Sequence, residues 1–418
     1  MSSHSVNHPR GNRKTVVIGF DFGTHSTKVV FRERGKADGH IACFDEAAQG
    51  YPSQVSPSLV RCADDRLFFG TEALRTSGGE LFTSLKVRLL PGCEQHADSF
   101  PCGLNSRTLV AAYLAWAFQE LRLGLTQYAD ANVFLNFAAP MSHFENRELK
   151  NRYLQIIQAA WNVSFGEPAT RIYQGLPISE AARIFVPMLE EPVLGPEHRR
   201  FEVLPETIAP VVSLSLDPWM EPGMYVIVDT GAGTTEISVF HAGESGADQK
   251  VLCYQDETML LGGNDLHLAE RLEEPRQSLA IDKITKRLEQ QFRRLWHLGY
   301  LMDAPNHHSR KRWKELTIVL SGGGTRHVAV ATHLSDVNPM HAWPEDDTNL
   351  KVCRHMPGTL ELDSHMDDDD GSMFAVANGL AIERKHWPVI FQRDQIEPLT
   401  PTEEIENKPK SYWYLDAK

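Results

Sequence analysis

The sequence is short of cysteine, of long apolar runs and of positive charge. Its 418 residues include six cysteines, and no two of them stand in a C-x-x-C spacing. The spacing therefore predicts neither a zinc site nor a disulfide framework. No apolar run reaches the roughly 20 residues that a membrane-spanning helix needs. Residues 1–14 are polar, which predicts a disordered tail and no secretion signal. We expect a cytoplasmic protein that makes no contact with a membrane.

The charge balance argues against nucleic acid as a partner. Lys and Arg number 42 and Asp and Glu 55, which gives a formal charge of −13 at pH 7. Phosphate backbones are bound by clustered positive charge, so no nucleic-acid partner is expected. The acidic run at residues 367–370 and the histidines fit no metal-ligand spacing, and we expect them at the surface. These histidines are His307, His308, His341, His355 and His365.

The apolar pattern predicts an α/β protein with more than one core. The chain is longer than one compact core usually fills, which favours two domains of similar size. Strand-like segments occur at residues 15–21, 26–31, 133–137, 225–229, 236–240 and 316–320. Helical spacing or capping occurs at residues 107–125, 142–161, 179–185, 282–301, 326–334 and 373–384. Residues 162–205 are rich in proline, and we interpret them as an irregular insertion.

One pattern occurs twice, about half the chain apart. Residues 17–31 read VIGFDFGTHSTKVVF, and residues 225–240 read YVIVDTGAGTTEISVF. Each is an apolar strand followed by Asp-x-Gly, small hydroxyl residues and a second strand. One such hairpin is often an ordinary turn. Two copies at this separation predict a duplicated domain with one site between the copies.

The residue types of the repeat suit a phosphate and a metal. Glycine lets backbone N–H groups approach a phosphate closely, and hydroxyl groups add donors. An aspartate at each strand end would repel phosphate, so Asp21 and Asp229 are predicted to hold hydrated Mg²⁺. The predicted ligand-binding residues of the two turns are Gly23, Thr24, His25, Ser26, Gly231, Ala232, Gly233 and Thr235.

The doubled hairpin resembles the phosphate-binding motifs of the superfamily that contains actin, DnaK-type chaperones and sugar kinases. Further segments resemble, in order, the nucleotide-binding half of a DnaK-type chaperone. They are YPSQVSPSLVRCADDRLFFGTE (51–72), SLKVRLLPG (84–92), residues 136–161, LPETIAPVVSL (204–214), LGGND (261–265), SGGGTR (321–326) and AVANGLAI (375–382). The ordered series carries the resemblance, because each motif has one place in that fold.

The resemblance implies a two-lobed actin-like ATPase fold of duplicated ribonuclease-H-like domains, with mixed sheets flanked by helices. Lobe I would cover residues 15–205 and lobe II residues 206–370. A helix at 371–390 would return to lobe I, and 391–418 would form a tail. Residues 263–321 are fewer than in chaperones, which implies a reduced upper subdomain. Nothing after Arg384 resembles a peptide-binding domain.

The resemblance also assigns roles around a Mg-ATP site. Glu206 would orient or deprotonate the attacking water, and Thr234 would donate to the γ-phosphate. Glu236 would join the two aspartates near the metal. Lys86 matches the phosphate-binding lysine of chaperones, whereas Lys28 matches the lysine of actin-type hairpins, so the choice between them stays open.

Glycine-rich turns are assigned to the rest of the nucleotide. Gly322, Gly323 and Gly324 lie between a predicted strand and a helix, where free N–H groups face a ligand. Arg326 would stack on adenine, because its guanidinium plane favours aromatic faces. Gly262 and Gly263 belong to the same assignment. The plain alternatives are a solvated glutamate at position 206 and an ordinary turn with an exposed arginine at position 326.

The expected function is a chaperone-like ATPase that converts ATP to ADP and phosphate. A protein partner would read the closure of its lobes. Two alternatives stay open. An actin-like filament former is supported by the Asp21–Lys28 spacing and by Ala232. A small-molecule kinase would need an acceptor pocket, which residues 162–205 would have to supply.

Overall fold

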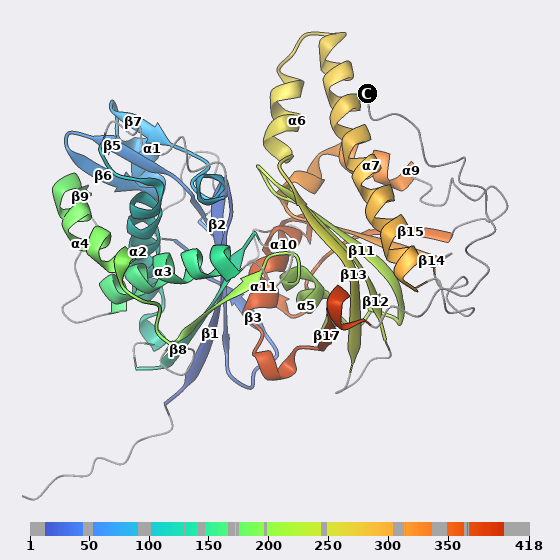
Figure 1. The fold of residues 1–418 in the computed structure, drawn as a ribbon, viewed down its shortest axis with the longest axis horizontal. Coiled ribbons are helices and arrows are strands. Elements are labelled where there is room, and N and C mark those ends of the chain that lie inside the picture. The colour runs from blue at the N-terminus through green and yellow to red at the C-terminus, as the bar shows by residue number, and fades with distance from the viewer. Residues whose placement is uncertain are drawn as a thin grey trace, which may run out of the picture.

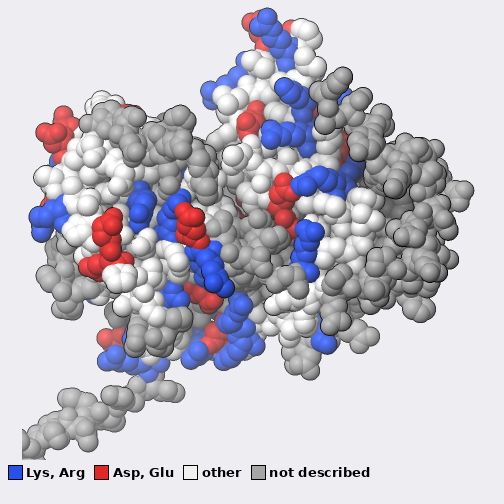
Figure 2. All heavy atoms as spheres, in the orientation of Figure 1, with Lys and Arg blue, Asp and Glu red and all other residues white. Residues whose placement is uncertain are grey.

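The computed structural model describes residues 13–44, 53–90, 102–128, 130–140, 147–165, 172, 175–195, 199–243, 249–303, 313, 315–336, 349–362, 366 and 368–396. These residues form a mixed α/β fold with two large mixed sheets and one small antiparallel sheet, flanked by helices (Figure 1). Within them, no helix combines the length and the apolarity needed to cross a bilayer. On the face in Figure 2, basic and acidic side chains are interspersed.

The first large sheet has the strand order β10-β8-β1-β2-β3-β16, with β4 beside β2. Its strands are β1 (Thr15–Phe22), β2 (Ser26–Glu33), β3 (Gly39–Ile41), β4 (Val55–Pro57), β8 (Asn132–Ala139), β10 (Phe201–Pro205) and β16 (Leu360–Glu361). β1 runs antiparallel to β2 and parallel to β8, and β8 runs parallel to β10. The first predicted hairpin thus lies at the centre of this sheet.

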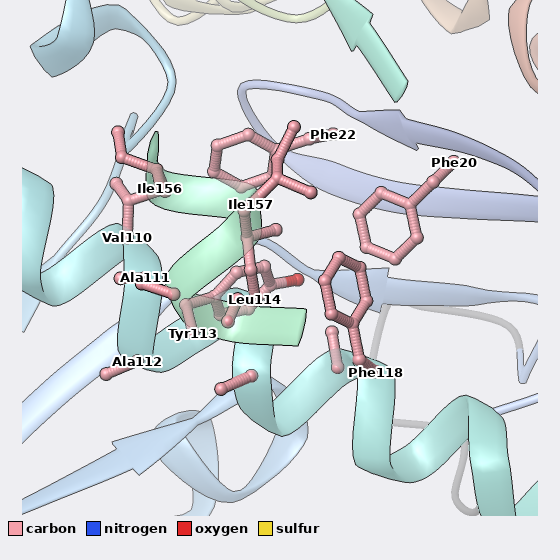
Figure 3. Close-up of a cluster of buried hydrophobic side chains, with 14 of the residues drawn as sticks. Phe20, Phe22, Val110, Ala111, Ala112, Tyr113, Leu114, Phe118, Ile156 and Ile157 are labelled. Carbon is pink, nitrogen blue, oxygen red and sulfur yellow. The ribbon is translucent and has the colours of Figure 1, made fainter. Parts of the chain in front are cut away.

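Aromatic side chains pack the first sheet against its helices. The helices are α2 (Ser106–Gly124), α3 (Arg147–Phe165) and α4 (Ile178–Glu190). Phe20 and Phe22 of β1 meet Phe118 and Tyr113 of α2 (Figure 3), with ring centroids 5.2 Å apart for Phe20 and Phe118. β1 is buried on both faces, as is usual for a strand covered on both sides. This packing fixes the position at which β1 delivers Asp21.

The second large sheet repeats the arrangement of the first. Its order is β15-β14-β11-β12-β13-β17. The strands are β11 (Gly223–Thr230), β12 (Thr235–Ala242), β13 (Lys250–Met259), β14 (Glu315–Ser321), β15 (Asn349–Arg354) and β17 (Val389–Phe391). β11 pairs antiparallel with β12 and parallel with β14, which is parallel to β15. The repeat seen in two hairpins therefore extends over whole sheets.

Helices of the second sheet include a protruding pair, α6 (Gly263–Glu270) and α7 (Arg276–Asp303) (Figure 1). α9 (Val328–Asp336) packs beside α7. Trp296 of α7 meets the buried Trp313 with ring centroids 4.5 Å apart. The second sheet thus has its own core, separate from that of the first.

Two short helices lie between the large sheets. α11 (Ala375–Leu380) packs on β1, where a Cβ atom on Gly19 would lie 2.0 Å from Ala377 O. α5 (Ala209–Ser215) packs on the second sheet. The two helices also touch each other, since a Cβ atom on Gly379 would lie 1.8 Å from Ala209 O. Glycine at both positions permits this close approach of backbones.

A small sheet with the order β7-β5-β6-β9 completes the N-terminal part. It contains β5 (Val60–Ala63), β6 (Arg66–Phe69), β7 (Glu80–Phe82) and β9 (Leu176–Pro177), with α1 (Gly70–Arg75) after β6. The short helix η1 (Val87–Leu89) follows β7. Lys86 directly precedes η1, and its side chain reaches Glu206, the residue after β10 of the first sheet.

Apart from strands that were not predicted, such as β13 and β15, the structure departs from the sequence prediction in four places. Within residues 162–205, α4 packs on α2 and α3, and β10 belongs to the first sheet, so this stretch is more ordered than an irregular insertion. The helix predicted at 373–384 is short, with η6 (Ser372–Phe374) before α11 and η7 (Arg384–His386) after it. Where the returning helix was predicted to end and the tail to begin, residues 389–391 form β17, which pairs with β13. Ser142, the predicted cap of α3, lies outside the described residues.

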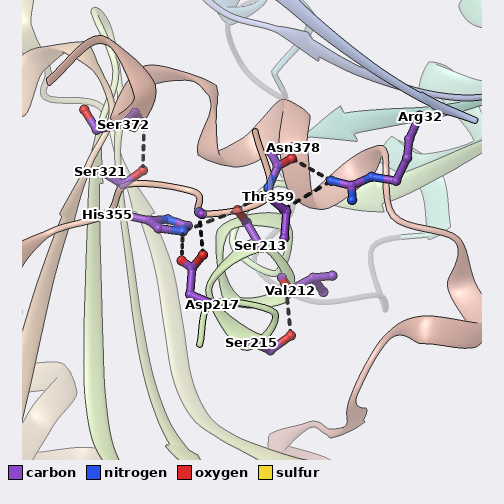
Figure 4. Close-up of polar contacts among 11 residues, drawn as sticks. Arg32, Val212, Ser213, Ser215, Asp217, Ser321, His355, Thr359, Ser372 and Asn378 are labelled. Atoms are coloured by element: carbon purple, nitrogen blue, oxygen red, sulfur yellow. Dashed lines mark hydrogen bonds and ion pairs between the residues drawn. The ribbon is translucent and has the colours of Figure 1, made fainter. Parts of the chain in front are cut away.

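The fourth departure is His355, which is buried and not at the surface. It is 0% exposed, and its Nε2 atom lies 3.1 Å from Asp217 Oδ2 and 3.3 Å from Ser213 Oγ (Figure 4). Burial of a histidine is tolerated here because polar partners accompany it. The other four histidines expected at the surface lie outside the described residues.

Candidate functional site

A cleft of about 710 Å³ opens where the two central hairpins approach each other. It collects most of the residues predicted from the sequence. They are Asp21, Gly23, Thr24, His25, Ser26, Lys28, Lys86, Glu206, Asp229, Gly231, Ala232, Thr234, Glu236, Gly263, Gly322, Gly323, Gly324 and Arg326. Residues as far apart in the chain as Asp21 and Arg326 therefore line a single cavity.

The first hairpin places an acid beside a base. β1 and β2 pair Asp21 with Lys28, and Lys28 Nζ donates to Asp21 Oδ2 over 2.9 Å. Burial lowers the pKa of Lys28, but the charge and hydrogen bond of Asp21 outweigh this effect, so its pKa is raised overall. Lys28 therefore stays charged, and the first hairpin is neutralised within itself.

The second hairpin places two acids at the corresponding positions. β11 and β12 pair Asp229 with Glu236, and both side chains are buried. Burial raises the pKa of Asp229 to about 7, and the charges of Glu206 and Asp21 add to this rise. Burial and the charge of Glu206 also raise the pKa of Glu236 well above its ordinary value. Proton or cation binding is therefore favoured on this side of the cleft.

A buried ion pair lies on the N-terminal side of the cleft, between the residue before η1 and the residue after β10. Lys86 is 2% exposed and Glu206 is 5% exposed, and Lys86 Nζ donates to both carboxylate oxygens of Glu206. Burial, together with the charge of Asp21, raises the pKa of Glu206 above its ordinary value, although Lys86 opposes this rise. Burial lowers the pKa of Lys86, but the charges of Glu206 and Glu236 outweigh this and raise it. Both candidate lysines line the cleft, and each already neutralises one carboxylate.

Three buried oxygen atoms in the cleft wall have no hydrogen-bond partner among the described residues. They are Asp21 Oδ1, Thr24 Oγ1 and Glu236 Oε1. A buried polar atom without a partner costs free energy, so such atoms mark places where a ligand, an ion or water is expected. Two of the three are carboxylate oxygens, which suit a cation or its hydration shell.

The turn of the second hairpin is fixed by glycine contacts. Gly231 N donates to Thr234 O over 2.8 Å, and Gly263 N at the start of α6 donates to Gly231 O over 2.8 Å. A Cβ atom on Gly262 would lie 2.4 Å from Ala232 O, and one on Gly233 would lie 2.7 Å from Thr24 Cγ2.

Three residues predicted to bind the ligand do not line the cleft. Gly233, Gly262 and Thr235 lie at the turn of the second hairpin but outside the cleft lining, and Thr235 Oγ1 donates to Leu261 O. Their direct contact with a ligand stays a prediction.

The glycine-rich turn after β14 lies against the second hairpin. Gly322 has φ +80°, and a Cβ atom on it would lie 2.3 Å from Asp229 Oδ1. Any larger residue would therefore displace Asp229 as well as strain the backbone. Arg326, at the end of this turn, forms an ion pair with Asp370.

Several other residues that line the cleft were not assigned to it from the sequence. One of them, Asp370, belongs to the acidic run that we expected at the surface, but it is half-buried in α10 (Asp368–Gly371). Among them, His327 Nε2 lies 2.8 Å from Glu270 Oε1, and His267 and Asp370 are close by. Val55, Met373 and Val376 supply apolar lining. These residues come from separate elements with no repeated motif. Only His267 and Glu270, which lie three residues apart on α6, could have been expected from the local sequence to lie close together.

No three His, Cys, Asp or Glu side chains come together as a direct metal site in the described part of the chain. The role expected of Asp21 and Asp229 does not require such a group. Mg²⁺ usually keeps several waters and is bound through one or two carboxylates together with substrate phosphates. Their role at the metal stays a prediction.

Comparison with known proteins gives no assignment for this site. No protein-family model matches the chain, and no curated protein matches its sequence significantly. The geometry of the cleft is therefore the basis for the function argued below.

Proposed function

We propose that the protein is an Mg²⁺-dependent ATPase with a two-lobed actin-like fold of duplicated ribonuclease-H-like domains. One observation carries the proposal: each large sheet delivers an Asp-x-Gly hairpin to the same cleft. The shared strand order of the two sheets supports the duplication. Two glycine-rich turns facing one cavity supply N–H donors from both sides, which suits a polyphosphate.

The charges of the cleft suit a metal–triphosphate complex. Lys28 and Lys86 offer positive charge to phosphate oxygens, and Thr234 offers a hydroxyl donor. The unpartnered oxygens of Asp21 and Glu236 offer acceptors for the waters around a cation. Bound Mg²⁺ would supply neutralisation of the phosphate charge.

Glu206 has the surroundings of a residue that positions water. Phosphoryl transfer depends mainly on positioning and on charge stabilisation. A raised pKa suits a general base that works near neutral pH. Both oxygens of Glu206 accept from Lys86, and each oxygen keeps a further acceptor site for a water.

The output of the cycle is expected to be a change in cleft width that a protein partner reads. α5 and α11 touch through Gly379, where a Cβ atom would lie 1.8 Å from Ala209 O, so this contact requires glycine. This contact is a suitable pivot, because hinge closure concentrates at a few positions. A filament former and a small-molecule kinase remain the alternatives.

Phosphate release in the presence of Mg-ATP tests the proposal. Wild type should hydrolyse ATP slowly, and Glu206→Gln should reduce the rate about 100-fold or more, within the range for loss of a general base. Glu202→Gln, on the neighbouring strand β10, is the matched control and should keep the wild-type rate. An equal rate for Glu206→Gln contradicts the role of Glu206. Sedimentation with ATP reveals a filament, and a phosphorylated acceptor reveals a kinase.

A further inference from the structure

A second cavity, of about 450 Å³, lies at the other end of α11 from the cleft. Val376, near the start of α11, lines the cleft, whereas Ala381 and Ile382, just after its end, line the second cavity. The rest of its wall includes the end of β2 and the turn that follows. None of the residues predicted from the phosphate-binding pattern belongs to this cavity.

Arg32 of β2 brings a buried positive charge to this cavity. It is 6% exposed, and its Nη2 atom donates to Asn378 Oδ1 over 2.9 Å and to Thr359 Oγ1 over 3.3 Å (Figure 4). Both acceptors are uncharged. Nε has no hydrogen-bond partner among the described residues, and no carboxylate there lies within ion-pair distance of the guanidinium. Burial lowers the pKa of Arg32, and the charge of Asp38 only partly opposes this.

A guanidinium in these surroundings calls for a counter-ion. Arginine does not lose its proton in proteins, so it cannot relieve the cost of burial by becoming neutral. Buried charges are therefore normally paired with an opposite charge. Arg32 has room for one, because it lines an open cavity.

Basic side chains outnumber acidic ones in the wall of this cavity. Lys36 and His386 line it with Arg32, and Arg34 lines it while paired with Glu383. The two carboxylates of the lining, Glu33 and Glu383, already form ion pairs with other side chains. In Figure 2, basic side chains gather with a few acidic ones at the lower middle of the face, where Figure 1 shows β3.

The guanidinium is held in place by a buried polar chain. Asn378 accepts from Arg32 through Oδ1 and donates through Nδ2 to Ser213 Oγ over 2.9 Å. Ser213 in turn contacts His355, which lies beside Asp217 (Figure 4). Because its partners are fixed, Arg32 loses little freedom when a ligand binds.

We propose that this cavity binds a small oxyanion whose oxygens accept hydrogen bonds from Arg32. The planar fork of guanidinium matches the oxygens of both phosphate and carboxylate groups. The ligand is thus a small molecule that carries one of these groups, and its site is distinct from the nucleotide cleft.

Thermal unfolding of the full chain with inorganic phosphate or with citrate, at constant ionic strength and without nucleotide, tests this site. Because the nucleotide cleft is also expected to bind phosphate, all variants carry Lys86→Met as a common background that weakens phosphate binding in the cleft. At millimolar concentration, at least one anion should raise the midpoint in this background. Adding Arg32→Met should weaken the apparent affinity about tenfold or more, the change expected when a hydrogen bond to a charged group is lost. Arg34→Met, at a partly exposed arginine, should have a smaller effect.

The two anions distinguish the ligand classes. A response to phosphate alone assigns a phosphate group, and a response to citrate alone assigns a carboxylate. If Arg32→Met fails to fold, Arg32→Lys takes its place. This variant keeps the positive charge but loses the planar guanidinium, and it should still weaken the rise of the midpoint with the anion. No response to either anion, or a response that Arg32→Met leaves unchanged, overturns the proposal. No arm contains ATP, so the outcome is independent of the proposed ATPase.

Discussion

The two central hairpins share one backbone plan and differ in charge. In the first, Asp21 lies opposite Lys28, and in the second, Asp229 lies opposite Glu236, at matching register positions. The first pair neutralises itself at 2.9 Å. The second adds two buried carboxylates whose pKa values are both raised by burial. The second hairpin therefore needs a proton or a cation to balance its negative charge, whereas in the first hairpin Lys28 already balances the charge of Asp21.

Because of this difference, substitutions at equivalent positions of the two hairpins should have opposite effects on the stability of the folded chain. A buried acid without a positive partner destabilises the folded chain, and functional sites often keep such groups at a cost in stability. A change that unbalances the first hairpin should therefore destabilise the protein. A change that removes charge from the second should stabilise it when no ligand is bound.

The largest expected effect is that of Lys28→Met, which makes the first hairpin resemble the second. It leaves Asp21 buried without its cation. Because Lys28 is partly exposed, we expect a loss of about 2–4 kcal/mol in the free energy of unfolding, somewhat below the cost of breaking a fully buried pair. Denaturant unfolding measures the change. The double variant Asp21→Asn/Lys28→Met should recover much of the loss, and a loss of equal size in the double variant would contradict the pairing.

A smaller change of opposite sign is expected for Asp229→Asn. The amide cannot ionise, so the nucleotide-free variant at pH 8 should gain on the order of 1–3 kcal/mol in the free energy of unfolding. The same variant should lose the stabilisation that Mg-ATP gives wild type. Asp256→Asn, at an acid of β13 outside the cleft lining, serves as the control. Lower stability of Asp229→Asn without nucleotide would show that the second hairpin is balanced as it stands.

The smallest expected effect is the pH dependence of the stability that Asp229→Asn gains over wild type. The pKa of Asp229 rises from its ordinary 3.8 to about 7 in the folded chain. The folded state then binds this proton more tightly than the unfolded state. Its contribution to stability is full below about pH 4 and is lost as the pH rises through 7. The difference between Asp229→Asn and wild type should grow over this interval in the presence of a chelator. A difference that is constant with pH would assign the effect to something other than this carboxyl group.

The sequence predicted the parts of the site that are encoded locally. An Asp-x-Gly turn between two apolar strands forms from neighbouring residues, so both hairpins and the acids at their strand ends could be located in advance. The turn after β14 was found for the same reason, since a strand, three glycines and a helix follow one another. The repeat then indicated that the two hairpins share a site.

Contacts between distant segments could not be predicted in this way. Lys86 and Glu206 are 120 residues apart, and nothing in either segment specifies that they form a buried ion pair. The strands of the small sheet have only two to four residues, too few to show an alternating pattern. β10 was missed because proline-rich sequence surrounds it, although its Pro205 ends the strand, where the lack of an N–H group does little harm.

The effect of Mg²⁺ on ATP binding tests the central claim most directly. Thermal unfolding of wild type is measured with ATP and Mg²⁺, with ATP and a chelator, and with Mg²⁺ alone. Mg-ATP at a hundredfold excess over Kd should stabilise the protein by about 2.7 kcal/mol. ATP with a chelator should stabilise it far less, because the carboxylates of the second hairpin then repel the phosphates. No stabilisation by millimolar Mg-ATP, or equal stabilisation with and without Mg²⁺, would contradict the account.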